Sequence, residues 1–218
     1  VWTRCTRTIF NFQSGFTRGH MAGSTMALAA FGDPTRFHND FYKMLTTDLH
    51  LVTFKHPQQP DENTGTDPIH PYLQKWREIA DRSIQDKYNL AAGLQSATET
   101  YLQELFTKAL ELYDIKDNIN LCLSGGVMLN SVFVGKIKSW FPQIKEVYVT
   151  PTPHDGGLPI GCCQYIWHHE LDNERIVWKD DFSPYLGRTY SKQEVFQALE
   201  KYKDEVLRKK PGKQAAKG

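Results

Sequence analysis

The chain has 218 residues, a hydrophobic content of 40% and a formal net charge of +1 at pH 7. The hydrophobic content is enough for a buried core, while the near-neutral charge gives no electrostatic reason to expect a nucleic acid or an anionic membrane as a partner. No apolar run approaches the roughly twenty residues that span a bilayer. The four cysteines lack a metal-binding spacing, so we expect reduced thiols in a cytoplasmic protein.

The first half of the chain is predicted to be mainly helical. Short strands are expected at Thr8–Phe12 and Leu49–Phe54, and residues 56–68, rich in Pro, Gln, Asp and Asn, are typical of an exposed loop. Apolar periodicity predicts a short buried helix over 23–31 and further helices over 35–45, 71–83 and 87–113. The longest of these has an apolar stripe made by Leu90, Leu94, Ala97, Tyr101, Leu105 and Leu112.

The second half contains two strand-turn-helix units in tandem. The run Leu121–Leu123 leads into Gly125 and Gly126 and then a helix-like pattern. The run 146–150 leads into the turn 151–157 and an apolar helix that begins at Leu158. Strands alternating with helices predict an α/β fold with parallel pairing, and a further amphipathic helix is expected over 192–207.

Ligands of such sheets bind beyond the carboxyl ends of the strands, where both glycine turns fall. If the two strands are neighbours, both turns face one crevice. A strand that turns through glycines into a helix directs backbone N–H groups at one point, an arrangement that suits a phosphate. Gly125 and Gly126 leave room for a ligand near the backbone, and Asn130, one turn into the helix, could bind a ribose hydroxyl or a phosphate.

Asp155 precedes Gly156 and Gly157 at the second strand end, where a carboxylate can bind a divalent ion that bridges phosphate oxygens. A structural alternative stands beside each of these interpretations. The glycines serve tight turns in many proteins, Asn130 could be a surface residue, and most loop aspartates make local hydrogen bonds.

Five segments, taken together and in order, resemble the O-carbamoyltransferases of nodulation and antibiotic biosynthesis. Their first domain is related to the universal tRNA threonylcarbamoyladenosine proteins. The matching segments are Met26–Pro34, Asn89–Glu99, Gly125–Asn130, Pro151–Gly161 and Pro184–Gly187. The third corresponds to the family's Gly-Gly-Val-x-Leu-Asn turn, and the second to its Ala-Ala-x-x-Gln-x-x-x-Glu helix.

The resemblance implies an actin-like, ATP-binding fold built from ribonuclease-H-like subdomains. Residues 1–180 would form part of that domain, with the core of the second subdomain at about 88–170, and 181–218 would begin the linker, with a disordered basic tail over 208–218. The family uses ATP and carbamoyl phosphate to make carbamoyl-adenylate, with a divalent metal (Fe²⁺ or Mg²⁺), and transfers the carbamoyl group to a small-molecule hydroxyl.

By this resemblance Gly125, Gly126 and Asn130 contact the nucleotide, Asp155 is a catalytic metal ligand, and Gly156 and Gly157 pack against the phosphates. The family's metal histidines, spaced His-x-x-x-His, have no counterpart among the eight histidines. Ser24 and Ala27 replace a common Lys and Gly. We therefore expect a carbamoyltransferase fragment, incomplete alone and able to form a homo-oligomer through its exposed broken face. A sugar-kinase-like enzyme and a non-catalytic nucleotide-binding module are the alternatives.

Overall fold

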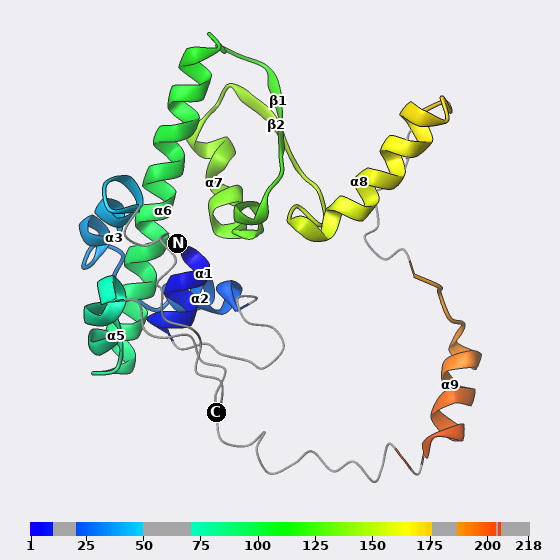
Figure 1. The fold of residues 1–218 in the computed structure, drawn as a ribbon, viewed down its shortest axis with the longest axis horizontal. Coiled ribbons are helices and arrows are strands. Elements are labelled where there is room, and N and C mark those ends of the chain that lie inside the picture. Colours follow the sequence, from blue (N-terminus) through cyan, green and yellow to red (C-terminus); the bar gives the residue numbers. More distant parts are fainter. Residues whose placement is uncertain (11–20, 50–70, 176–186, 204, 206–218) are drawn as a thin grey trace. The chain divides into compact units, whose positions relative to one another are not determined.

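A computed structural model describes residues 1–10, 21–49, 71–175, 187–203 and 205 (Figure 1). The chain divides into two compact units, Val1–Asn173 and Glu174–Gly218. The described part is a mixed α/β structure, mostly helical, with one small parallel sheet. None of its helices is both long and apolar enough to cross a membrane.

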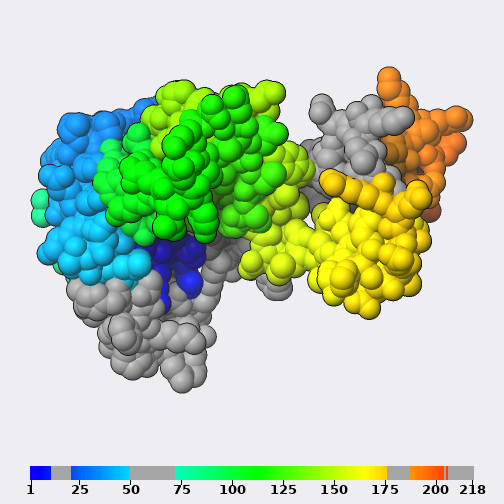
Figure 2. Space-filling model, turned by 90° about the horizontal axis from the view of Figure 1, so that it is seen from above, coloured from blue at the N-terminus to red at the C-terminus, as the bar shows by residue number. Residues whose placement is uncertain are grey.

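The N-terminal helices of the first unit pack around the first half of α6 (Ile84–Leu112). They are α1 (Trp2–Thr8), α2 (Ala22–Ala29), α3 (His38–Thr46) and α5 (Gln74–Ala80), the last preceded by the 3-10 turn η2 (Pro71–Leu73). Their shared core includes Phe41, Met44, Leu73, Trp76 and Leu90. The packing of α3 against α6, also visible in Figure 2, is close: a Cβ on Gly93 would lie 2.9 Å from the Cβ of Phe37.

Helix α6 changes its buried face along its length. It begins at the N-cap Ser83, whose hydroxyl accepts a hydrogen bond from the Asp86 backbone N–H. Its first half buries Leu90, Leu94 and Ala97 in the core just described. Its second half contributes other side chains (Leu102, Phe106 and Leu110) to a separate core. The predicted single stripe is therefore wrong beyond Tyr101: Leu105 is 47% exposed and Leu112 78% exposed.

The second core joins α6 to the small sheet. Strand β1 (Ile119–Leu123) is followed by the 3-10 turn η3 (Gly126–Leu129), α7 (Ser131–Trp140) and strand β2 (Ile144–Val149). The strands pair in parallel, with Leu121 opposite Val147 and Leu123 opposite Val149. Phe133 and Ile137 of α7 are fully buried in this core, which is why α7 stays packed against α6 and the sheet (Figure 1).

Beyond β2 the chain forms the 3-10 turn η4 (Asp155–Gly157), α8 (Leu158–Tyr165) and the π-helical turn η5 (Ile166–Glu170). Large apolar side chains of this last segment are exposed, among them Leu158, Tyr165, Ile166, Trp167 and Leu171. The second unit contains α9 (Lys192–Lys201), which begins with a reciprocal capping box between Ser191 and Glu194. Hydrogen bonds from Ser191 lower the pKa of the Glu194 carboxyl.

Several predicted elements differ from the structure. The strand at Thr8–Phe12 is wrong over its described part, because Thr8 ends α1. Cys5 and Ile9 lie one turn apart and are both buried, a spacing that favours a helix. The helix at 23–31 is present as α2, but it is not buried as expected: only Thr25 is. Of the strand predicted at Leu49–Phe54 only Leu49 is described, and it is helical; the rest of that strand and the loop predicted over 56–68 lie outside the described residues.

The four thiols should differ sharply in reactivity. Burial raises the pKa of the Cys5 thiol to about 12, so at pH 8 this group is protonated in the folded chain. Cys122, Cys162 and Cys163 are exposed. A chromogenic disulfide reagent at pH 8 should therefore label three thiols quickly and the fourth only after unfolding in denaturant. Cys5→Ala should remove the slow phase alone, and four fast thiols in the folded protein would contradict this structure.

Candidate functional site

Parallel pairing of β1 and β2 brings the two glycine turns together. The Gly125 backbone N–H donates a 2.7 Å hydrogen bond to the Pro153 carbonyl oxygen. The Ser124 hydroxyl donates to the same oxygen at 3.3 Å. The two strands are thus neighbours, which was the condition for both turns to face one crevice. Both turns lie at the carboxyl edge of the sheet.

The first turn needs glycine and leaves its backbone open. Gly125 has φ +106° and ψ 153°, a conformation that is essentially restricted to glycine. Among the residues that the structure describes, no atom outside the immediate chain neighbours lies within 4 Å of where a Gly125 Cβ would be. Gly126, also exposed, begins η3, which the Met128 N–H closes by donating to the Gly125 carbonyl at 3.0 Å. A ligand can therefore approach the backbone at Gly125 and Gly126.

The second turn uses its glycines internally. The His154 Nδ1 accepts a 2.9 Å hydrogen bond from the Gly156 N–H. A Cβ on Gly156 would lie 2.5 Å from the His154 ring, and one on Gly157 would lie 2.4 Å from the Thr152 carbonyl oxygen. The packing of the turn itself thus accounts for both glycines. The Asp155 side chain between them and His154 is exposed.

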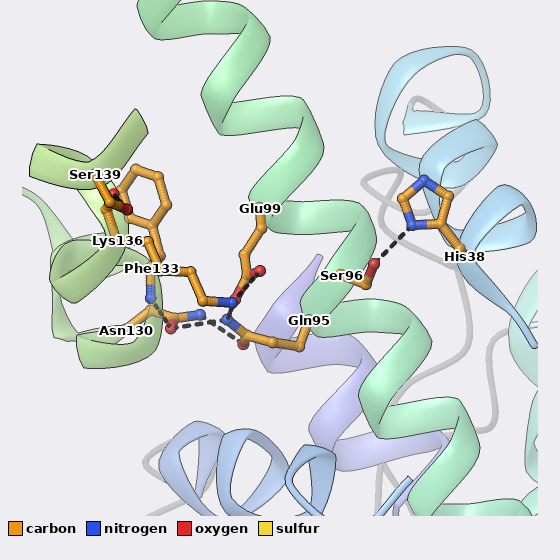
Figure 3. Close-up of polar contacts among 8 residues, drawn as sticks. All are labelled: His38, Gln95, Ser96, Glu99, Asn130, Phe133, Lys136 and Ser139. Atoms are coloured by element: carbon orange, nitrogen blue, oxygen red, sulfur yellow. Dashed lines mark hydrogen bonds and ion pairs between the residues drawn. The ribbon is translucent and has the colours of Figure 1, made fainter. Parts of the chain in front are cut away.

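Asn130 is the N-cap of α7 and not a residue one turn inside the helix, because Gly126–Leu129 form a separate 3-10 turn. Its Oδ1 accepts a 3.2 Å hydrogen bond from the Phe133 N–H. Its amide also pairs reciprocally with the amide of Gln95 on α6, at 2.9 and 3.1 Å (Figure 3). Asn130 therefore ties the glycine turn to α6.

Gln95 continues into a chain of polar contacts that the sequence did not single out as functional. Its Nε2 donates to Glu99 Oε1 at 2.8 Å, and Glu99 Oε2 forms a 2.7 Å ion pair with Lys136 of α7 (Figure 3). The signal was present: Gln95 and Glu99 are polar residues spaced i,i+4 at the mostly buried middle of α6, around residues 89–98. On another face of α6, His38 Nδ1 lies 2.9 Å from the Ser96 hydroxyl.

The described residues do not assemble a complete metal site. They contain no group of three or more His, Cys, Asp and Glu side chains placed to hold an ion. Asp155 fits as a single ligand that is open to solvent. Any further ligands of an ion at this position would have to come from a substrate or from outside the described residues.

Comparison with known proteins decides the family. The family model for the carbamoyltransferase N-terminus matches residues 6–164. The chain belongs to this family. The match includes both glycine turns, α6 and Asp155, so the site lies wholly within the family domain. No solved structure matches the chain.

Two relatives are themselves described only as uncharacterized proteins. One, MJ1058 of Methanocaldococcus jannaschii, is 31% identical over 204 residues, which are 91% of this chain and 31% of the relative. The other, sll1178 of Synechocystis, is 34% identical over 113 residues, which are 51% of this chain and 18% of the relative. The chain thus matches less than a third of the length of either relative.

Alanine substitutions at Gly125 and at Gly135 should have opposite effects on the stability of the protein. Gly125→Ala places a Cβ at φ +106° and should lower the free energy of unfolding by about 1–3 kcal/mol. Gly135 lies in α7, and outside the helix itself no described residue comes within 4 Å of where its Cβ would be. Gly135→Ala should therefore leave the free energy of unfolding unchanged or raise it by up to about 1 kcal/mol. Urea unfolding followed by circular dichroism measures both. Equal effects of the two substitutions would show that Gly125 is not held in this conformation.

Proposed function

We propose that this chain supplies part of the nucleotide-binding site of a carbamoyltransferase. The reaction would be ATP-dependent activation of carbamoyl phosphate to carbamoyl-adenylate, followed by carbamoyl transfer to a hydroxyl of a small molecule. Membership of the carbamoyltransferase N-terminal family supports carbamoyl transfer in general. The observation that carries the nucleotide proposal is the meeting of two glycine turns at one sheet edge, through the Gly125 N–H and Pro153.

Each part of the edge suits an anionic substrate. The exposed backbone at Gly125 and Gly126 would face the phosphates. Among the described residues outside the chain neighbours, none lies within 4 Å of where a Gly125 Cβ would be, and near Gly126 only the His154 Cβ does, at 3.9 Å. The N-terminus of α7 begins directly after Asn130, so its dipole adds positive potential beside the same turn. When bound, ATP would supply the adenylyl group, while the residues of the chain hold and orient its phosphates.

Asp155 would contribute one ligand to a divalent ion, Fe²⁺ or Mg²⁺, shared with phosphate oxygens. Its carboxylate is exposed at the start of η4, on the turn that accepts the hydrogen bond from Gly125. A hard anionic oxygen ligand suits Mg²⁺, and Fe²⁺ also accepts carboxylates. Gly156 and Gly157 would then set the backbone path of the turn that presents Asp155.

The wider proposal is an actin-like fold, with β1, α7 and β2 as a piece of one ribonuclease-H-like subdomain in a cytoplasmic enzyme. The parallel pairing of β1 and β2 agrees with such a sheet. A non-catalytic nucleotide-binding module is the second candidate, favoured by the lack of a three-ligand metal cluster in the described residues. A sugar-kinase-like activity finds no support in the family match, which is to a carbamoyltransferase domain.

Calorimetric titration with ATP, with and without Fe²⁺ or Mg²⁺, tests the site. Asp155→Ala should weaken ATP binding about tenfold in the presence of the metal and much less in its absence, because it removes an ion ligand. Asp117→Ala is the matched control, since Asp117 is an exposed aspartate just before β1, at the opposite end of the strand. ATP binding that ignores both metal and Asp155 would contradict the metal proposal and favour the non-catalytic module.

The reaction type is distinguished by its products. The complete gene product, incubated with ATP and carbamoyl phosphate, should release both phosphate and pyrophosphate. Water displaces the phosphate of carbamoyl phosphate to leave carbamate, and the carbamate oxygen then attacks the α-phosphorus of ATP, which breaks the bond between the α- and β-phosphates. A kinase would instead release ADP. Absence of pyrophosphate release that depends on carbamoyl phosphate would overturn the proposed activity.

A further inference from the structure

We propose that Gln95, Glu99 and Lys136 are positioning residues that hold Asn130, and through it the Gly125–Gly126 turn, in a nucleotide-binding conformation. The inference rests on the proposed function for its ligand, but the mechanical linkage stands on contacts of its own. The three side chains come from α6 and α7, and together with Asn130 they form one continuous polar chain (Figure 3). None of the three needs to touch the nucleotide.

The groups at the two ends of this polar network fix the orientation of the Gln95 and Asn130 amides. The Glu99 carboxylate can only accept, so it must face the NH₂ group of Gln95, 2.8 Å away. The Phe133 N–H can only donate, so it must face Oδ1 of Asn130, 3.2 Å away. With both ends set, the Gln95 oxygen faces the Asn130 NH₂ group and the Gln95 NH₂ group faces the Asn130 oxygen. Flipping either amide would bring two acceptors or two donors together.

Burial makes this arrangement costly to disturb. Gln95 is only 6% exposed. The Glu99 side chain is 13% exposed, and its charge is balanced by the Lys136 ammonium at 2.7 Å. A buried polar group that loses its hydrogen-bond partner keeps its desolvation cost without compensation. The side chains of the polar network therefore stabilise one another as a unit. Lys136, with a side chain that is 44% exposed, closes the outer end.

The same bonds limit what Asn130 can offer a ligand. Its Oδ1 already accepts from both Gln95 and the Phe133 N–H, which occupies its two lone pairs. Its Nδ2 donates one bond to Gln95, and its second N–H has no partner among the described residues. Asn130 is therefore poised to donate to an acceptor oxygen, such as a phosphate oxygen or a ribose hydroxyl oxygen, and not to accept from a hydroxyl.

The linkage reaches the glycine turn through a short backbone path. The Asn130 N–H donates to the Val127 carbonyl at 3.0 Å, and the Met128 N–H donates to the Gly125 carbonyl at 3.0 Å. A shift of the Asn130 cap therefore moves η3 and the exposed residues Gly126 and Val127 at its start. Gln95 lies 35 positions before Asn130 in the chain, so α6 braces the turn from outside the strand-turn-helix unit.

Three variants test the linkage. Gln95→Met removes both amide groups while keeping the side-chain length, Glu99→Gln removes the charge that orients Gln95, and Lys136→Met removes the balancing ammonium. Gln103→Met is the matched control, because Gln103 lies on the same helix and its side chain takes no part in this network. Each is measured by thermal unfolding, by ATP titration, and by NMR of the chain labelled with ¹⁵N-glycine and free of nucleotide.

We expect Gln95→Met and Glu99→Gln to shift the amide signals of Gly125 and Gly126 while leaving Gly23, which lies in α2 and takes no part in the network, unchanged. ATP affinity should fall about tenfold in folded Gln95→Met, the loss expected for one well-placed hydrogen bond. The control should change neither property. If Gln95→Met does not fold, the near-isosteric Glu99→Gln and the partly exposed Lys136→Met make the same test.

A merely structural role predicts a different result. The variants would then lower the unfolding temperature, but the folded protein would keep wild-type glycine signals and ATP affinity, and the proposal would be overturned. A wild-type chain that binds no ATP would contradict the proposed function instead. In that case the signals of Gly125 and Gly126 alone would decide whether Gln95 and Glu99 hold the turn.

Discussion

The parallel pairing of β1 with β2 is the constraint on which the site depends. Pairing places the ends of both strands at one edge, and the bond from Gly125 N–H to Pro153 then joins the turns that follow them. The pairing in turn requires the crossover helix α7, whose Phe133 and Ile137 fill the space between the sheet and α6. A parallel sheet needs its face covered in this way, because the crossover that connects the strands is also the element that buries them.

Helix α6 connects this sheet to the rest of the first unit. Its first half packs into the N-terminal helical core and its second half packs into the sheet core. One helix therefore spans both cores. Gln95 and Glu99 lie between these halves, where α6 passes the start of α7. A polar network at this point specifies the rotation and register of α6 against the turn, which apolar packing alone fixes less sharply. The glycine turn is therefore supported from two directions, by β2 and by α6.

Many secondary-structure elements could be predicted from local sequence patterns. The other features depend on contacts between residues that are far apart in the sequence. Both strand-turn-helix units and the long helix were predicted because their periodicity and glycines are local signals. The stripe on α6 failed beyond Tyr101 because its second half packs against a different core, which no local pattern announces. Thr8 was assigned to a strand because β-branched and aromatic neighbours favour one, whereas burial of Cys5 and Ile9 one turn apart favours a helix. The role of Gln95 depended on Asn130, 35 residues later.

The two glycine pairs, similar as motifs, differ in what requires them. A Cβ on Gly156 or Gly157 would clash with His154 or Thr152 within the same turn. Both positions would therefore need glycine even if no ligand bound there. Gly125 is required by its backbone conformation, and no atom of the described residues beyond its chain neighbours lies within 4 Å of where its Cβ would be. A tight strand-to-helix turn alone does not need that open space, but a ligand that approaches the backbone does. In the proposed function, the first turn and the exposed Asp155 would therefore contact the ligands, and the second pair of glycines would shape the loop that presents this carboxylate.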